Sequence, residues 1–231
     1  MEKNELKIIK EGKTGHGILI ENDGYMYVKN PQTIKEGLEN GEWHVPYPFI
    51  VDAVFQKFGI KNANGRIYPE VTLKKQVELY QQKIDERRAL GELNHPSEST
   101  IDLGRIAINI VELHWEGATL VGKLEINTSH GFRKYGIVTT RGDEMANLLL
   151  NGYKIGVSSR GVGSVEQKLG QYIVGDDFEL ICWDVVSDPS TPGAYIGNPE
   201  DLQQYVENKQ HTNSKPSLNE KIDKIKNILN S

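Results

Sequence analysis

The chain has a single cysteine, Cys182, and this scarcity excludes an internal disulfide and a multi-cysteine zinc site. It has no apolar run approaching the roughly 18 residues that a membrane-spanning helix needs. Its charged N-terminus also lacks the apolar core of a secretory signal. Positive charge is not in excess: the net charge is −5, which gives no electrostatic reason to expect nucleic acid as the main partner. We therefore expect a cytoplasmic protein without a membrane or nucleic-acid partner.

The apolar pattern predicts an α+β fold. Apolar runs bounded by turn residues predict strands, and apolar spacings of three or four residues predict helices. Six or more strands and two or three helices in no βαβ rhythm favour α+β over a doubly wound sheet. The predicted strands cover residues 15–20, 25–28, 49–55, 106–115, 119–126, 171–174 and 178–186, with a hairpin-type turn at 22–24, and the predicted helices cover 70–88 and 143–151.

The composition changes after about residue 200. Polar residues dominate as far as Pro216, which predicts a flexible linker over residues 201–216. Residues 217–231 regain helical apolar spacing, with Ser217 as the N-cap and Glu220 three residues on. We expect one folded domain over residues 1–200, then the linker, then an amphipathic helix that is a docking element or a removable tail. A terminus without a role is the alternative.

The segment Ile155–Gly163 combines two serines, an arginine and three glycines, and we expect it to enter a strand directly after the helix predicted at 143–151. A serine in a glycine-rich turn can be held exposed, with peptide N–H groups free to point at a developing oxyanion. The loop Gly91–Pro96 places His95 before a proline that stiffens it, and the acidic run Asp176–Asp184 follows downstream. A serine, a histidine and a carboxylate are the parts of an activated nucleophile, so these three segments predict a candidate hydrolytic site.

Each of these signals also fits a residue without a catalytic role. A loop histidine is most often a surface residue, and turns rich in glycine and serine are usually only turns. His114 is a rival base, placed in a predicted strand. No grouping of His, Asp and Glu has the spacing of metal ligands, so we expect no metal and no cofactor.

Three motifs together resemble one known family. The segments Gly91–Pro96, Gly156–Gly161 and Trp183–Tyr195 are similar to those of the prohead core proteases of tailed bacteriophages, and Asn62–Pro69 with the following helix is similar as well. The resemblance covers roughly residues 45 to 197 in order. These are maturation serine proteases, distantly related in fold to herpesvirus assemblins. The resemblance implies a β-barrel-like, mostly antiparallel sheet flanked by helices, with residues 1–200 as the protease domain.

The resemblance also implies roles for individual residues. Ser158 aligns with the nucleophile and His95 with the general base. Asp184 is our choice for the third member of a Ser-His-Asp triad, with Asp188 next and His114 as a further alternative. We expect oxyanion stabilisation from Ser159, Arg160 and Gly161, with a structural salt bridge as an equally good account of Arg160.

The same resemblance implies substrates and a setting. These are scaffold or core proteins and the major capsid protein, cut inside the assembling prohead in the host cytoplasm. Cleavage after glutamate, with an apolar residue two positions earlier, makes Glu207 and Glu220 candidate self-cleavage sites. Assemblins gain activity on dimerising, which suggests a homo-oligomer. A non-catalytic core or scaffold component, and an esterase or acyltransferase with the same residues, are the alternatives.

Overall fold

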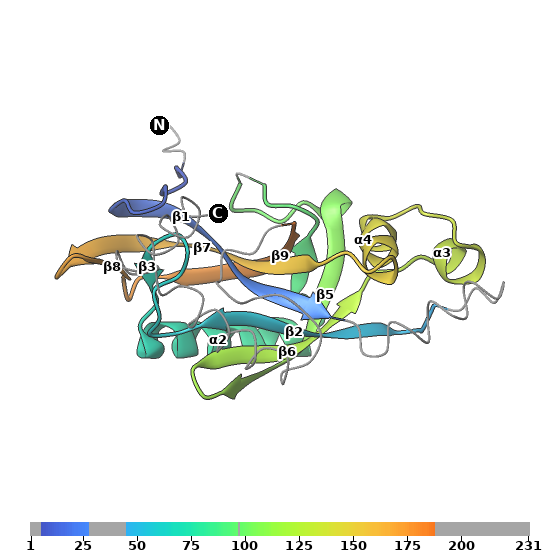
Figure 1. Cartoon of the computed structure of the whole chain (residues 1–231), viewed down its shortest axis with the longest axis horizontal. Helices are drawn as coiled ribbons and strands as arrows, with labels where there is room; N and C mark the ends of the chain where they lie inside the picture. The colour runs from blue at the N-terminus through green and yellow to red at the C-terminus, as the bar shows by residue number, and fades with distance from the viewer. Residues whose placement is uncertain (1–5, 28–44, 97, 188–231) are drawn as a thin grey trace, which may run out of the picture. The chain divides into compact units, whose positions relative to one another are not determined.

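The computed structural model describes residues 6–27, 45–96 and 98–187. In this part of the chain, nine strands form one mixed, mainly antiparallel sheet with helices packed on it (Figure 1). None of its helices is long and apolar enough to cross a membrane. In chain order the elements are β1 Gly15–Tyr27, β2 Phe49–Lys57, β3 Arg66–Ile67, α2 Glu70–Asp85, β4 Leu90–Glu92, η1 Leu103–Arg105, β5 Ile106–Glu116, β6 Thr119–Ile126, α3 His130–Tyr135, α4 Arg141–Leu150, β7 Ile155–Lys168, β8 Gln171–Val174 and β9 Glu179–Val186.

Strand β7 organises the sheet. The strand order is β3-β8-β7-β1-β2-β6-β5-β4, and β9 pairs with β7 outside this path. One edge of β7 pairs with β1; Gly156–Val162 pair with β9, and Val165–Lys168 pair with β8. All pairs of these strands are antiparallel except β3–β8. The α+β prediction with a mostly antiparallel sheet is confirmed. The sheet is not a closed barrel: β4 and β9 lie side by side without a strand ladder, and an isolated bridge joins Leu93, just after β4, to Val185 of β9.

The N-terminal hairpin predicted at residues 22–24 is wrong. Residues Gly15–Tyr27 form one strand, whose register with β7 shifts between Glu21 and Gly24. Both halves of β1 pair with β7, and the second half also pairs with β2. These long-range ladders keep the chain extended, so the turn-forming residues are accommodated as a bulge. Sequence periodicity alone cannot report this, because the partner strands lie far away in the sequence.

The helices follow the predicted pattern more closely. Helix α2 buries its apolar stripe, which includes Leu73, Val77 and Tyr80, and it packs on β5 and β9. Helix α4 starts with a capping box between Thr140 and Asp143 and is followed by Gly152 in the left-handed conformation. Helix α3 was not predicted, because six residues are too short to show a helical period.

The core beneath the sheet is centred on an aromatic cluster. Trp183 is fully buried and meets Phe55 and Tyr80 edge to face, with ring centroids 5.3 and 4.9 Å apart. Side chains alternate between the two faces of a strand, so the residue after Trp183 points to the other face of β9. That residue is Asp184. The packing of Trp183 therefore fixes which face of the sheet carries the Asp184 carboxylate.

Candidate active site

Ser158 lies inside strand β7, directly opposite Asp184 on β9. Side chains of directly opposed residues lie on the same face of an antiparallel pair. The bulge of β1 falls at this point, since Glu21 pairs with Ser159 and Gly24 pairs with Val157. Ser158 is fully buried. The nucleophile candidate therefore sits in a paired strand, so the expected entry of this segment into a strand is confirmed. The expected exposure of the serine in a glycine-rich turn is wrong.

Close packing explains why this glycine-rich segment forms a strand. A Cβ at Gly161 would lie 2.7 Å from Cζ of Phe178, and one at Gly163 would lie 2.8 Å from its Cα. Both distances are too short for real side chains, so these glycines make room for Phe178 against the strand. The glycines serve strand packing here rather than a turn.

The segment after β4 delivers His95 to Ser158. Gly91 lies so close to the backbone of β9 that a side chain would overlap the carbonyl oxygen of Trp183. Next, the Asn94 N–H donates to the Val185 carbonyl at 2.8 Å, and Asn94 adopts φ +65°. These contacts bend the chain over the sheet and bring the His95 imidazole into contact with Ser158 Oγ. The side chain of His95 is 12% exposed.

The imidazole joins the serine to the carboxylate. His95 Nε2 contacts Ser158 Oγ, and His95 Nδ1 lies 2.8 Å from Asp184 Oδ2. Burial opposes the charge of Asp184, but its hydrogen bond to His95 and the charge of Arg160 outweigh burial and hold the pKa of Asp184 below its ordinary value. An ionised carboxylate only accepts hydrogen bonds, so Nδ1–H donates to it. Nε2 is then free to accept from the serine hydroxyl.

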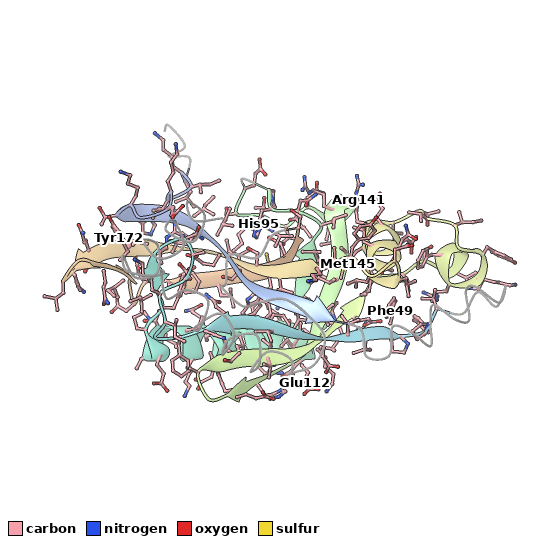
Figure 2. All side chains as sticks on the ribbon, viewed as in Figure 1. Phe49, His95, Glu112, Arg141, Met145 and Tyr172 are labelled. Atoms are coloured by element: carbon pink, nitrogen blue, oxygen red, sulfur yellow. The ribbon has the colours of Figure 1, made fainter. Side chains whose placement is uncertain are left out.

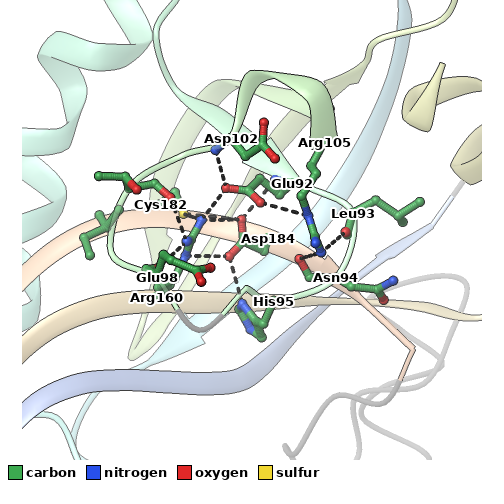
Figure 3. Close-up of polar contacts among 12 residues, drawn as sticks. Glu92, Leu93, Asn94, His95, Glu98, Asp102, Arg105, Arg160, Cys182 and Asp184 are labelled. Carbon is green, nitrogen blue, oxygen red and sulfur yellow. Dashed lines mark hydrogen bonds and ion pairs between the residues drawn. The ribbon is translucent and has the colours of Figure 1, made fainter. Parts of the chain in front are cut away.

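Arg160 points into the protein beside Asp184 (Figure 3). Its Nε lies 3.0 Å from Asp184 Oδ2 and its Nη2 lies 3.0 Å from Glu92 Oε1, and all three side chains are fully buried. Its Nη1 donates to the carbonyl oxygens of Glu98 and Thr100. The salt bridge considered for Arg160 is thus present.

For the predicted oxyanion role of Ser159, Arg160 and Gly161, the donors would have to be backbone N–H groups, because the Arg160 side chain is paired with carboxylates. All three residues lie in β7 between β1 and β9, where amides are directed at neighbouring strands. The Ser159 side chain is on the opposite face from Ser158 and faces the same way as Trp183. The oxyanion role stays a prediction.

Glu92 is a buried charged residue of this group that the sequence reasoning did not single out. Its carboxylate accepts from the Asp102 N–H at 2.9 Å and from Arg160, and its Oε2 lies 3.2 Å from Arg105 Nε. Its own N–H donates to Asp184 Oδ1 at 2.9 Å. The signal was available, because Glu92 lies within the Gly91–Pro96 motif, three residues before His95.

The remaining predicted site residues do not join this group. His114 lies on β5 with its side chain 50% exposed, between Glu112 and Glu116. Glu112 and His95 are well apart in Figure 2. Asp188, Glu207 and Glu220 lie outside the described residues, as do the predicted linker and tail helix. Within the described ranges no group of three or more His, Cys, Asp or Glu residues is placed to hold a metal ion.

Comparisons with known proteins identify the family of this chain. The family described as "Prohead core protein serine protease" matches residues 16–206. The prohead core protein protease of Enterobacteria phage T4 is 34% identical over 150 residues, which is 63% of this chain and 66% of that relative, just under two thirds of its length. The solved structure of the bacteriophage T4 capsid assembly protease is similar with a TM-score of 0.58 and 26% identity, covering 73% of this chain and 96% of that one. This chain belongs to the prohead core protein serine protease family.

Proposed function

We propose that this protein is a serine endopeptidase in which Ser158 is the nucleophile, His95 the general base and Asp184 the residue that orients the base. The observation that carries the proposal is the continuous contact from Ser158 Oγ through the His95 ring to Asp184 Oδ2. Three separate segments, β7, the loop after β4, and β9, supply these groups. Membership of a serine protease family supports the same reading.

The chemistry follows from the order of the contacts. His95 Nε2 takes the proton of Ser158 Oγ as the oxygen bonds to the scissile carbonyl carbon, whose oxygen becomes the oxyanion. When the C–N bond breaks, the imidazolium returns that proton to the leaving amine. Water then cleaves the acyl-enzyme ester by the same route. General-base assistance of this kind contributes about 10²–10⁴-fold. The Asp184 carboxylate holds the tautomer and offsets the imidazolium charge.

The buried position of Ser158 adds a requirement for access. A peptide carbonyl must approach Ser158 Oγ to bonding distance, yet this side chain has no exposed surface. The oxyanion donors are proposed among the backbone amides of Ser159, Arg160 and Gly161; loss of one such donor costs on the order of 10²–10³ in rate.

The proposed substrates are the scaffold or core proteins and the major capsid protein of a phage prohead. Cleavage would take place inside the assembling prohead, in the host cytoplasm. The names of the family and of the matched T4 proteins support this assignment. Self-cleavage after Glu207 or Glu220 and a homo-oligomeric state remain part of the proposal.

The test is intact mass over time for purified wild type, Ser158→Ala and Ser164→Ala. Ser164 is the matched control, because it lies in the same strand but bonds Asp177. We expect wild type and Ser164→Ala to lose the residues after Glu207 or Glu220, and Ser158→Ala to stay intact. Labelling by a fluorophosphonate should follow the same pattern. Equal behaviour of wild type and Ser158→Ala in both measurements would contradict the proposal.

A further inference from the structure

One arginine connects every segment of the candidate site. Arg160 follows Ser158 by two residues on β7, so both side chains lie on the same face of the strand. Its guanidinium reaches Asp184 on β9, Glu92 on β4 and the main chain beyond His95. We propose, building on the proposed function, that Arg160 and Glu92 are positioning residues that set the orientation and the charge of Asp184 for His95.

The orientation of Asp184 depends on both of its oxygens being occupied. Oδ1 accepts the Glu92 N–H at 2.9 Å and lies 3.3 Å from Arg160 Nη2. With Oδ1 held there, Oδ2 faces His95 Nδ1. Arg160 Nε contacts that same Oδ2 at 3.0 Å from the inner side. A planar guanidinium in two contacts with one carboxylate fixes its plane, which a point charge such as a lysine ammonium does not.

The charged side chains of Arg160 and Glu92 also hold the loop that carries His95. Arg160 Nη1 donates to the carbonyl oxygens of Glu98 at 2.6 Å and Thr100 at 3.3 Å. Glu92 Oε1 accepts the N–H of Asp102 farther along. The segment after His95 is thus tied to the β7 and β4 side chains rather than to surface groups. Displacement of a catalytic group by about 1 Å can cost 10²-fold in rate, so loosening these bonds should impair the base.

The charges of the cluster are unequal. Arg160 brings one positive charge and Glu92 and Asp184 bring two negative ones, which leaves a net charge of −1 in a fully buried site. Arg105 also contacts Glu92, and because its side chain is 37% exposed to water, it offsets only part of this surplus. The imidazolium that forms on His95 during the reaction neutralises this surplus. Burial raises the pKa of the Cys182 thiol, so Cys182 adds no charge.

The groups of the hydrogen-bonded and ion-paired network around His95 come from several elements, and Ser158 and Asp184 touch the imidazole itself. They are Asp184 and Cys182 of β9, Ser158 and Arg160 of β7, Glu92 of β4 and Arg105 of η1. A change of charge at Arg160 or Glu92 therefore changes how strongly the surroundings stabilise the imidazolium. It should shift the pH at which activity falls on the acidic side of the pH–activity profile, which we call the acid limb. A merely structural role would change only the melting temperature and the overall rate.

The experiment is the rate of Ser158 labelling by a fluorophosphonate between pH 5 and 9, measured by mass for four variants. Arg160→Met should move the acid limb to higher pH and slow labelling about 10–100-fold. Glu92→Gln should move the limb to lower pH, because it removes one negative charge. Arg160→Met combined with Glu92→Gln restores the net charge and should return the limb toward wild type. Arg160→Lys should keep the limb but slow labelling, because it loses the planar contact.

Two controls make the test specific to the cluster of Arg160, Glu92 and Asp184. Glu21→Gln alters a different buried arginine–carboxylate pair and should leave the limb in place. If Arg160→Met does not fold, Glu92→Gln and Arg160→Lys still test the inference. A limb that stays at the wild-type pH in Glu92→Gln, with wild type labelled at Ser158, overturns the positioning role and leaves the proposed function standing. A wild type that is neither labelled nor self-cleaving contradicts the proposed function itself, and the inference with it.

Discussion

Two buried arginines in this protein form clusters that look alike but differ in their neighbours and in their balance of charge. Arg66 is 1% exposed and pairs with the fully buried Glu21 of β1; Arg160 is fully buried and pairs with Glu92 and Asp184. Each guanidinium also donates to main-chain oxygens, from Arg66 to Ile9 and from Arg160 to the loop after His95. Both clusters therefore tie a loop or terminal segment to the central strands. Only the second one contacts an imidazole.

The two clusters differ in the hydrogen-bond partners of their carboxylates and in their net charge. Glu21 accepts from four side chains, and its cluster pairs one positive with one negative charge; the donors are Asn62, Asn64, Arg66 and Tyr68. The Arg160 cluster has two carboxylates for one buried guanidinium, and one oxygen of Asp184 faces His95. A cluster with balanced charge has no surplus charge to act on a neighbouring group. A surplus negative charge beside an imidazole can also stabilise a proton on that imidazole.

Asp184→Asn should have the largest effect on activity of the substitutions in the two clusters. The amide can donate to His95 Nδ1 and so favour the wrong tautomer, and the buried cluster loses the charge that offsets the imidazolium. The equivalent change in serine proteases lowers kcat about 10⁴-fold. We expect a loss of this order in Ser158 labelling and in peptide cleavage, with a cooperative unfolding transition retained. A loss below tenfold would show that Asp184 is not the third member of the triad.

His114→Gln is the control for that substitution. His114 is half-exposed on β5 and contacts Glu112 and Glu116 rather than the Ser158 group. Labelling of Ser158 should be unchanged within error. A large loss in this variant would revive His114 as the third member.

Arg66→Met tests the other side of the comparison. Removal of one partner from a buried ion pair destabilises a protein by about 3–5 kcal/mol, because the remaining charge is left uncompensated. We expect a loss of this size in the free energy of unfolding, measured with urea. The labelling rate of the folded fraction should stay near wild type. A pH-dependent change in labelling would mean that the Glu21 cluster also acts on the site.

Asp143→Asn gives the smallest effect and shows what a buried carboxylate does without an arginine. Burial opposes the charge of Asp143, but N–H bonds from three residues outweigh it and hold its pKa below the ordinary value; they are Ser129, Thr139 and Thr140. The substitution disrupts the capping box of α4 and should cost about 1–2 kcal/mol near neutral pH.

The sign of the pH dependence follows from the lowered pKa of Asp143. A carboxyl group with a lowered folded pKa stabilises the protein above its unfolded pKa of about 3.9. That stability is lost as the pH falls through the folded value. Unfolding free energies of wild type and Asp143→Asn should therefore differ by a constant amount between pH 5 and 7 and converge below about pH 4. A difference that persists unchanged at pH 2.5 would contradict this role of the charge.

Local sequence patterns predicted much of the fold. The helix at Glu70–Asp85 and the strand pair joined at Glu116–Gly117 follow from apolar spacing and turn residues. The motif resemblance selected Ser158, His95 and Asp184, and the structure brings these three side chains into contact. Their catalytic roles stay predictions until the variants are measured.

The sequence by itself determined periodicity, turn-forming residues and the candidate chemical groups, because these depend on neighbours along the chain. Only the tertiary structure decided that Gly15–Tyr27 is one bulged strand and that Ser158 is buried opposite Asp184. It also decided that Arg160 faces Glu92 and Asp184. These outcomes depend on strand register and on contacts between residues more than 20 positions apart, and such long-range pairings leave no periodic trace in the sequence.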